Sequence, residues 1–372
     1  MSVAIVHDHL VQRGGAERLL ESMVRAFPGA ALHTSLFEPS ATHPGLSRLD
    51  VTTRPIDRVG FCRRHHRLVA PLLAPTFSSL RLDHDLVLCS STGWSHGARA
   101  TRGAKLVYFN TPARWLYTPD AFLADAGPLV RLATGATRRS LLSWDRRAVA
   151  GMDGCIANSR EIARRVQDAY GIDPPVVLPP VLVDAAAPQA PVVGVAPGYA
   201  LVVSRLIAYK QVEAVVRAFA ARPDDRLVVV GDGPEADRIA SIAGPNVTLL
   251  GVVDEPSLRW LYAHARLLVS AAYEDFGLTP IEAGAFGRPV AVLRDGGHLD
   301  TVAEGRSGVF FDAADPEAID AAIDQLDGTA WSEATIRDHA ASFDEAGFIR
   351  RLRELAADLV GAAALGPQEL VA

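Results

Sequence analysis

The chain has 372 residues, 49% of them apolar, and a formal net charge of −6, a length that favours two domains of ordinary size. No apolar run reaches the roughly 18 residues of a membrane span, and the start MSVAIVHDHL lacks the charged segment of a signal peptide, so we expect a cytoplasmic protein. A pI near 6.0, with the excess basic residues confined to one half, disfavours nucleic-acid binding.

The N-terminal half alternates apolar strands with amphipathic helices. SVAIVHDHL predicts a strand and GGAERLLESMVRAF the helix after it. Further strands are expected in AALHTSLF, at 85–91 and at 104–110, followed by a helix near 129–150. GCIANS and REIARRVQDAY form the last pair, with Ser159 as the N-cap. This alternation is typical of a parallel sheet covered on both faces.

Basic residues concentrate in this half. Residues 1–184 hold 22 Lys and Arg against 16 Asp and Glu, a balance of +6, which leaves 15 against 27, a balance of −12, for residues 185–372. Much of the excess lies in 54–81, where arginines and histidines adjoin apolar residues such as Phe61 and Phe77. This mixture suits an anionic lipid surface or a phospholipid-linked substrate; a solvated helix face beside a core stripe explains it equally well.

Residues 184–198, DAAAPQAPVVGVAPG, read as a linker because they are rich in Ala, Pro and Gly. Beyond them six strand and helix units of about twenty residues predict a second doubly wound domain. The final helix, EAGFIRRLRELAADLVGAAAL, either closes this domain or crosses back to the first. Three cysteines lie far apart in the sequence, so we expect reduced core thiols.

One motif, YEDFGLTPIEA, lies where a predicted strand of the second domain ends. Pro280 would open a helix with Thr279 as its N-cap, so that the amides of residues 277–279 face outward and favour an anion such as phosphate. Glu274 and Glu282 would flank whatever carries that phosphate. For Glu282, simple compensation of the helix dipole is the alternative.

Two further motifs fit the same ligand. Arg205 and Lys210, in SRLIAYKQ, follow the first strand of the second domain, and two cations beside an anion site suit a diphosphate. Only two lysines occur in the chain, against 35 arginines, which favours a functional role for Lys210. Gly14 and Gly15, in RGGAERLL, permit a close approach of backbone and ligand, although a structural turn explains them as well.

Together these three motifs resemble those of the retaining glycosyltransferases of family 4, which have the GT-B architecture. The segments YFNTPARWLY, ANS, GDGP, NVTLLG, EDFGLTPIEA and DGGHLDTV occur in the family's order, and the chain is similar to the O-antigen mannosyltransferase-like branch. The resemblance implies an α/β fold of two Rossmann-like, doubly wound domains facing across a cleft. Residues 1–184 would bind the acceptor, residues 185–344 would bind the donor, and the helix 345–372 could cross back.

The resemblance also implies roles for the motif residues. Arg205 and Lys210 would clamp the donor diphosphate and stabilise the charge on the leaving group. Glu274 would bind sugar hydroxyls, Glu282 the ribose hydroxyls, and backbone near Val252 and Val253 the base. No divalent metal and no cofactor besides the nucleotide sugar is implied. The full set expected around the donor is Gly14, Gly15, Arg205, Lys210, Val252, Val253, Glu274, Phe276, Gly277, Leu278, Thr279 and Glu282.

The sequence departs from the branch at Asn110, where histidine is usual and lies near the donor sugar or the reacting centre. Asparagine exchanges hydrogen bonds but carries no titrating proton at neutral pH. A mechanism in which the donor phosphate takes the acceptor proton tolerates this change. His96 would compensate from a neighbouring strand, unless it is structural. Arg114 would meet an acceptor phosphate, unless it is a surface residue.

The implied function is a retaining, metal-independent hexosyl transfer from a nucleotide sugar to a glycan or a polyprenyl- or other lipid-linked acceptor. GDP-mannose is the first expected donor and a UDP-sugar the second; the expected location is cytoplasmic, or peripheral on the inner face of the membrane. A nucleotide-sugar 2-epimerase, and a non-catalytic nucleotide-sugar-binding partner that regulates another transferase, are the alternatives. A nicotinamide dehydrogenase is disfavoured because G-x-G-x-x-G is absent, as is a Walker A sequence.

Overall fold

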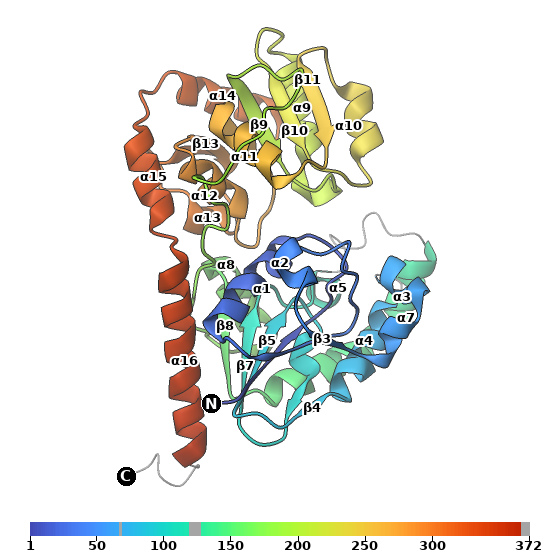
Figure 1. The fold of residues 1–372 in the computed structure, drawn as a ribbon. Coiled ribbons are helices and arrows are strands. Elements are labelled where there is room, and N and C mark those ends of the chain that lie inside the picture. Colours follow the sequence, from blue (N-terminus) through green and yellow to red (C-terminus); the bar gives the residue numbers. More distant parts are fainter. Residues whose placement is uncertain (67–68, 119–127, 366–372) are drawn as a thin grey trace. The chain divides into compact units, whose positions relative to one another are not determined.

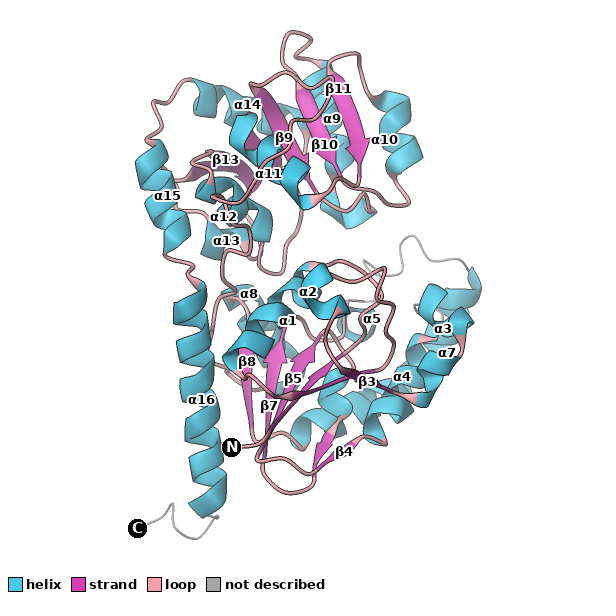
Figure 2. Ribbon diagram, in the orientation of Figure 1, coloured by secondary structure: helices cyan, strands magenta, loops and turns pink. Residues whose placement is uncertain are grey.

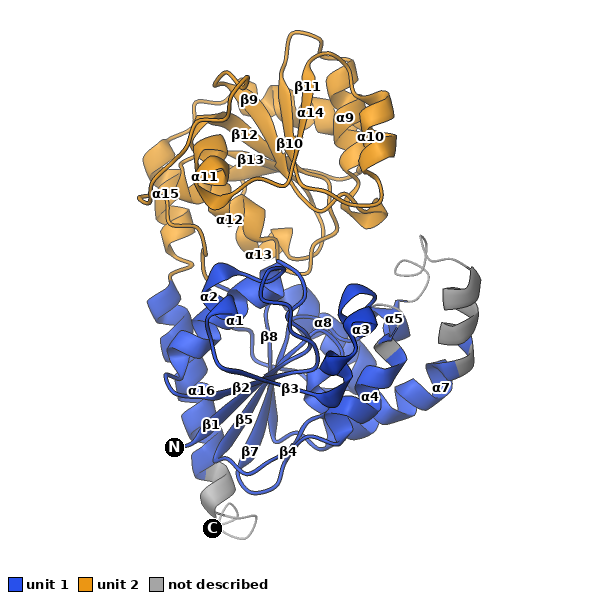
Figure 3. Ribbon diagram, turned by 45° about the vertical axis from the view of Figure 1, so that its right-hand side comes forward, with its two compact units in different colours: residues 1–179, 345–372 blue, residues 180–344 orange. Residues whose placement is uncertain are grey.

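The computed structural model describes residues 1–66, 69–118 and 128–365, which fall into two compact units (Figure 3). Unit 1 combines residues 1–179 with the segment from Glu345 onward, and unit 2 holds residues 180–344. The segment expected to be a linker, residues 184–198, belongs to unit 2, where Ala185, Val192 and Val195 pack against an apolar core cluster. The crossing point therefore lies about five residues before the expected one.

Unit 1 is built on a six-stranded parallel sheet (Figure 1). Its order is β3 (Val51–Thr53), β2 (Ala31–Thr34), β1 (Val3–His7), β5 (Leu86–Ser91), β7 (Ala104–Phe109) and β8 (Gly154–Ala157). A small second sheet pairs β4 (Arg81–Leu82) with β6 (Arg99–Ala100). Because β1 lies beside β2 on one side and β5 on the other, the chain reverses its direction of winding between β1 and β5.

Helices cover both faces of this sheet, so side chains alternate along β1 between two cores (Figure 2). Ala4 and Val6 face the core that contains Phe77 of α4, whereas Val3 and Ile5 face the core closed by α1. The helices are α1 (Gly15–Ala26), α2 (Pro44–Ser47), α3 (Gly60–Arg64), α4 (Ala70–Ser78), α5 (Arg114–Tyr117), α7 (Pro128–Ala150), α8 (Arg160–Tyr170) and α16 (Glu345–Leu365), with 3₁₀ turns η1 (Pro55–Arg58) and η2 (Ser95–Gly97). Ser159 caps α8 as predicted, accepting a hydrogen bond from the Ile162 amide at 3.1 Å.

Helix α16 packs in unit 1, against α1 and β7, although it follows unit 2 in the chain. Phe348, Leu352 and Ala356 join the same core cluster as Leu20 and Tyr108. Glu345, at its first turn, accepts hydrogen bonds from Arg25 and Ser22 of α1. The last helix therefore completes the core of the first unit; residues 366–372 of the expected helix lie outside the described residues.

Unit 2 repeats the topology of unit 1 with another six-stranded parallel sheet. The order is β11 (Val247–Gly251), β10 (Leu227–Val230), β9 (Tyr199–Val203), β12 (Ala265–Ser270), β13 (Val290–Leu293) and β14 (Gly308–Phe311). The winding reverses between β9 and β12. Its helices are α9 (Val212–Ala220), α10 (Ala236–Ile242), α11 (Glu255–His264), α12 (Leu278–Ala285), α13 (His298–Thr301), α14 (Pro316–Asp327) and α15 (Glu333–Ala341), with the turn η3 (Ala208–Lys210).

The expected doubly wound α/β fold is thus present in both units. Parallel strands buried on both faces read as continuous apolar runs, which is why their positions were predictable. Cys62, Cys89 and Cys155 are buried free thiols. Among the described residues, none of the helices combines the length and the apolar character needed to cross a membrane.

Candidate functional site

Two of the three sequence motifs lie in unit 2, and they meet at the point where its sheet reverses its winding. Lys210 follows β9 and Glu274 follows β12, and these strands are neighbours. The Lys210 Nζ atom lies 2.5 Å from Glu274 Oε1, and the two side chains are 11% and 19% exposed. Ligands of open α/β sheets bind outside the carboxyl ends of the strands at such a reversal. The Lys210–Glu274 pair therefore lies where the topology places a ligand.

The loop after β9 carries both Arg205 and Lys210. Lys210 ends the turn η3, and the next residue, Gln211, has a φ of 51°. Gln211 is the one non-glycine residue with positive φ in the described chain, and strain of this kind concentrates at functional sites. Arg205 is exposed and donates a hydrogen bond from its Nη2 to the Tyr209 hydroxyl at 3.0 Å. Both cations thus stand at the rim of the same strand end.

Helix α12 begins earlier than the sequence suggested. Its first residue is Leu278 and its N-cap is Gly277, with a φ of 88°, so the prediction of Thr279 as N-cap was wrong. Only glycine takes this left-handed conformation without strain, and it turns the chain into the helix two residues before Pro280. The amides of Leu278 and Thr279 have no partner within the helix, and Pro280 has no N–H. These two amides and the helix dipole favour an anion here.

The loop after β13 packs against the loop between β12 and α12. Sequence reasoning missed this supporting role. The Gly297 amide donates to the Glu274 carbonyl at 2.8 Å. A β-carbon on Gly296 would lie 2.3 Å from that carbonyl oxygen, and one on Gly297 would lie 2.2 Å from the Phe276 α-carbon. Two glycines are therefore required for the loops to touch. His298 follows them, fully buried, within the electrostatic reach of both Glu274 and Lys210.

The other expected donor residues of unit 2 lie at different depths. The Glu282 carboxylate is 4% exposed and accepts a hydrogen bond from the Tyr262 hydroxyl of α11 at 2.8 Å. Phe276 is buried and packs edge-on against Phe343, so only its backbone faces the loop. Val252 follows β11 and is 73% exposed, whereas its neighbour Val253 packs against the core.

Unit 1 also carries polar residues at the reversal of its sheet, but they are buried. Asn110, after β7, donates from Nδ2 to Ser90 Oγ at 3.0 Å, and that oxygen lies 3.1 Å from His7 Nδ1. Asp8 accepts hydrogen bonds from the Ser95 amide at 2.6 Å and the Thr92 amide at 3.0 Å. The side chain of Asn110, expected near the reacting centre, is thus engaged within its own unit.

Glu17 of α1, which sequence reasoning also missed, accounts for the first glycine of the Gly-Gly motif. A β-carbon on Gly14 would lie 2.4 Å from Glu17 Oε2, so Gly14 makes room for this carboxylate. Burial alone would raise the pKa of Glu17, but His7, His9 and the hydrogen bond from Gln12 outweigh it and lower the pKa to about 2. A buried carboxylate beside the α1 N-terminus disfavours a phosphate there, and we therefore leave Gly14 and Gly15 out of the phosphate site.

The two residues expected to meet an acceptor differ in accessibility. His96 is fully buried, with Nδ1 2.9 Å from Ser91 Oγ and Nε2 3.0 Å from Asp145 Oδ1. Tyr117 donates to the other oxygen of Asp145 at 2.6 Å, which completes a network inside the unit. His96 is therefore structural. Arg114 opens the short helix α5 and is half-buried.

Chemically, the strand ends of unit 2 bring together two kinds of group. Lys210, Arg205 and the first amides of α12 donate to anions, whereas the Glu274 carboxylate accepts hydrogen bonds from hydroxyls. A ligand with both phosphate and hydroxyl groups matches this set. No group of three or more His, Cys, Asp or Glu side chains in the described ranges is arranged to hold a metal ion.

Family models match both halves of the chain. The family described as "Glycosyltransferase Family 4" matches residues 13–185, and that described as "Glycosyl transferases group 1" matches residues 188–327. The two matches fall in the two halves of the chain. They include the Gly-Gly motif, the Arg205–Lys210 pair and both glutamates of the E-x7-E element.

Curated relatives match mainly over part of their length. The GDP-mannose-dependent alpha-mannosyltransferase of Corynebacterium glutamicum is 35% identical over 134 residues, which are 35% of this chain and 32% of that protein. The D-inositol 3-phosphate glycosyltransferase of Corynebacterium kroppenstedtii is 29% identical over 164 residues, 40% of this chain and 36% of that protein. The matched region thus spans about a third of each relative.

Solved structures match over almost the whole chain. The Anabaena protein HepE, in complex with UDP and glucose, has a TM-score of 0.69 at 18% identity and covers 96% of this chain and 99% of its own. Sucrose-phosphate synthase from Thermosynechococcus elongatus has a TM-score of 0.71 at 19% identity, covering 97% and 100%. At such identities the likeness shows the fold alone. Because family models match both halves, the chain belongs to glycosyltransferase family 4, and it has the two-domain GT-B fold.

Proposed function

We propose that the protein transfers a hexosyl unit, with retention of configuration and without a metal ion, from a nucleotide sugar bound by unit 2 to a glycan or lipid-linked acceptor bound by unit 1. The observation that carries this proposal is the contact of Lys210 with Glu274 beside the start of α12. A cation, two amides and a carboxylate at one strand reversal match the phosphates and hydroxyls of such a donor.

In this proposal the residues divide the work. Lys210 has three N–H donors, so it can keep Glu274 and also contact a phosphate oxygen. Arg205, at the rim, and the amides of Leu278 and Thr279 bind the same diphosphate and stabilise the charge that develops as it leaves. Glu274 binds sugar hydroxyls, Glu282 the ribose, and the exposed backbone near Val252 the base. The leaving phosphate takes the acceptor proton, a route that does not need a titrating side chain at Asn110.

Two classes of donor match the proposed site. GDP-mannose is favoured because the Corynebacterium glutamicum relative is named as GDP-mannose-dependent. A UDP-sugar is the second candidate, because HepE was solved with UDP and with UDP-glucose. Both donors carry the diphosphate that Arg205 and Lys210 would bind, so the test includes both.

The test measures nucleoside diphosphate release by the full chain from GDP-mannose and UDP-glucose, with and without lipid extracts or polyprenyl-linked glycans as acceptors. Arg205→Ala and Glu274→Ala are each expected to lower kcat/KM by about 100-fold or more, because each removes a transition-state or sugar contact. Arg217→Ala, which removes an exposed ion pair with Glu213, is the matched control. Near-normal rates for both site variants would contradict the proposal. A chemical change in the sugar of the donor in the absence of an acceptor would indicate an epimerase.

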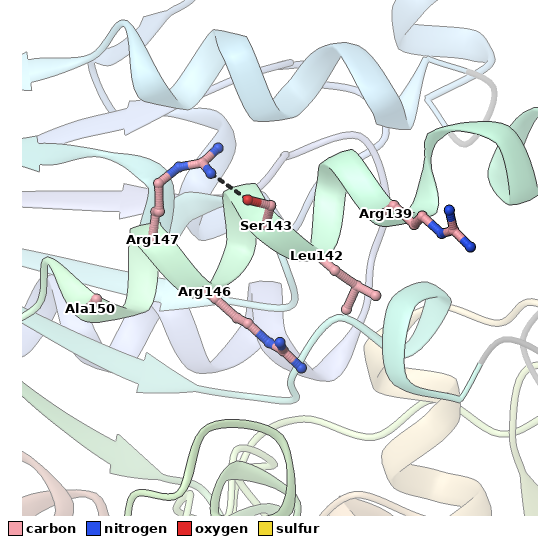
Figure 4. Close-up of a pocket in the computed structure, with 6 residues that line it drawn as sticks. All are labelled: Arg139, Leu142, Ser143, Arg146, Arg147 and Ala150. Atoms are coloured by element: carbon pink, nitrogen blue, oxygen red, sulfur yellow. Dashed lines mark hydrogen bonds between the residues drawn. The ribbon is translucent and has the colours of Figure 1, made fainter.

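We also propose that unit 1 contacts an anionic membrane surface from the cytoplasmic side. Val59 and Phe61 are 51% exposed and Leu72 is 53% exposed, and Arg58 and Arg64 are exposed among them. Residues 67 and 68 of this basic segment lie outside the described residues. A second basic surface lies on α7, where a shallow hollow is lined by Arg139, Leu142, Ser143, Arg146, Arg147 and Ala150 (Figure 4).

Vesicle sedimentation tests the membrane contact. The full chain is expected to bind vesicles that contain anionic phospholipid, and to bind less as salt rises, because basic residues are attracted to the charged surface. Phe61→Ser combined with Leu72→Ser should weaken binding several-fold. Replacing the α7 arginine Arg146 by Ser measures the contribution of the second surface. Equal binding to neutral and anionic vesicles would contradict the proposal.

A further inference from the structure

His298 is a buried histidine with one ring nitrogen engaged and the other unengaged. It opens α13 and is fully buried. Its Nδ1 atom lies 3.1 Å from the carbonyl oxygen of Leu293, at the end of β13. A carbonyl oxygen only accepts hydrogen bonds, so Nδ1 must carry the proton. Burial also lowers the pKa of His298, which keeps the ring neutral at pH 7. Its Nε2 atom is therefore a hydrogen-bond acceptor.

This acceptor has no hydrogen-bond partner in the part of the chain that the structure describes. The Thr301 hydroxyl nearby is directed to the carbonyl oxygen of Gly297, at 3.3 Å. An unsatisfied buried acceptor costs about 1–3 kcal/mol, so this nitrogen calls for a partner that donates a hydrogen bond, either a water or a group of a ligand.

The unengaged edge of the ring faces the start of α12. A β-carbon on Gly277 would lie 2.9 Å from His298 Cδ2 and 3.5 Å from Nε2. Gly277 is the N-cap whose helix exposes the amides of Leu278 and Thr279. The charges of Glu274 and Lys210 also act on the ring. The loops after β12 and β13 thus meet at the ring edge that carries Nε2, and the charge of Lys210, from the loop after β9, acts on the same ring.

We infer that His298 Nε2 accepts a hydrogen bond from a hydroxyl of the donor sugar and so helps to select that sugar. The inference rests on the proposed function and deepens it. A diphosphate at neutral pH offers only acceptor oxygens, which a neutral Nε2 cannot bind. A sugar hydroxyl is a donor. The amides and cations therefore bind the phosphates, and the two acceptors, His298 Nε2 and the Glu274 carboxylate, bind the sugar.

Two variants separate the two nitrogens of the ring. In His298→Asn the side-chain amide occupies the Nδ1 position, so it keeps a donor for Leu293 but lacks the atom that faces the site. In His298→Gln the amide reaches the Nε2 position and supplies an oxygen that accepts. Calorimetry would measure Kd for GDP, GDP-mannose, UDP and UDP-glucose on the full-length chain, and thermal unfolding would confirm that each variant folds.

We expect His298→Asn to weaken binding of the preferred nucleotide sugar about tenfold and that of its nucleoside diphosphate by less than twofold. His298→Gln should recover a large part of the loss. Deoxyfluoro analogues replace one sugar hydroxyl by fluorine, which cannot donate a hydrogen bond. For one of these analogues, the wild type should bind the analogue about tenfold more weakly than the parent nucleotide sugar. His298→Asn should bind that analogue and the parent with equal affinity.

A matched control is available on α11. His264 likewise has its Nδ1 near a carbonyl oxygen, that of Trp260 at 2.8 Å, and His264→Asn should leave both affinities unchanged. Equal weakening of diphosphate and nucleotide sugar in His298→Asn would overturn the inference and leave the proposed function in place. A wild type that binds UDP or GDP but gains nothing from either sugar would overturn both.

Discussion

The two units share one topology but use the reversal of their sheets differently. In unit 1 the residues at this point, His7, Asp8, Ser90 and Asn110, are buried and hydrogen-bonded to one another or to nearby backbone. In unit 2 the residues are partly exposed and include an arginine and a lysine. The same fold therefore supplies a place for polar groups in both units. In unit 1 these groups bind one another, and in unit 2, in our proposal, they bind a ligand.

The two lysines of the chain show the contrast in a single residue type. Lys105 in unit 1 is 3% exposed, and its Nζ donates to the carbonyl oxygens of His96 at 3.1 Å and Ala148 at 2.9 Å. Burial lowers the pKa of Lys105. Lys210 in unit 2 pairs with a carboxylate at the rim. One lysine satisfies the backbone of its own unit, and the other, in our proposal, binds the donor diphosphate.

The largest expected effect is a loss of activity when the lysine of unit 2 is replaced. Lys210→Ala should lower kcat/KM by about 100- to 1,000-fold, because a donor to the leaving diphosphate is lost, with little change in unfolding temperature. Lys105→Met should do the reverse: it leaves two buried carbonyl groups without a donor and costs about 2 kcal/mol, with donor affinity retained. Steady-state kinetics and urea unfolding of both variants measure the two effects. A stability loss in Lys210→Ala equal to that in Lys105→Met would remove the distinction.

The next effect concerns Glu17 of unit 1. Its pKa of about 2 against a usual 4.5 corresponds to a stabilisation on the order of 3 kcal/mol at pH 7. Glu17→Ala should therefore lower the free energy of unfolding by about that amount while UDP or GDP affinity stays within twofold. Glu17→Gln keeps the volume and a hydrogen bond, and should cost less. A large loss of nucleotide affinity in either variant would place Glu17 in the donor site instead.

The pH dependence of stability follows from the same groups. Glu17 has a lowered pKa, so its contribution is present above about pH 4.5 and is lost as the pH falls towards 2. Burial lowers the pKa values of His9 and His298, so protonation favours the unfolded chain and stability falls as the pH drops below about 6.5. Urea midpoints from pH 8 to 3 should decline in two stages. In Glu17→Gln the stage below pH 4.5 should be smaller.

The smallest effect tests why Gly14 is a glycine. Gly14→Ala should destabilise the protein by about 1–2 kcal/mol, because the new methyl group meets Glu17 Oε2 at 2.4 Å. In the double variant Gly14→Ala with Glu17→Gln the penalty should persist, and with Glu17→Ala it should largely disappear. Gly135→Ala is the control, because no atom lies near its position within α7 and the change favours helix by up to about 1 kcal/mol.

The sequence was sufficient to predict most of the strands and to predict that two motifs lie close together. Continuous apolar runs marked β5, β7 and β9, and the alternation with helices implied parallel sheets, so Lys210 and Glu274 could be placed at neighbouring strand ends. The strand β3 was missed because Val51–Thr53 is short and not fully buried at the sheet edge. Thr279 was predicted as the N-cap because it precedes Pro280. The helix starts earlier because Gly277 adopts a left-handed conformation.

Buried polar groups were harder to predict because burial depends on residues far apart in the chain. Glu17 looks like a glutamate that compensates a helix dipole, and only the approach of His7 from β1 shows that it is inside. His298 was visible in DGGHLDTV, but its environment depends on Gly277, Gly296 and Gly297 allowing two loops to touch. The Gly-Gly-His sequence after a predicted strand was the available signal.

The position of α16 has a consequence for how the protein is made. The ribosome synthesises residues 1–179 before unit 2, and the helix that completes the core of unit 1 after it. Leu20 and Tyr108 therefore lack their packing partners Phe348 and Leu352 while unit 2 is synthesised. Unit 2 is continuous in sequence and can fold as soon as it emerges. A nascent or truncated chain that ends before Glu345 thus presents an open apolar surface on unit 1, the kind of surface that chaperones hold and proteases find.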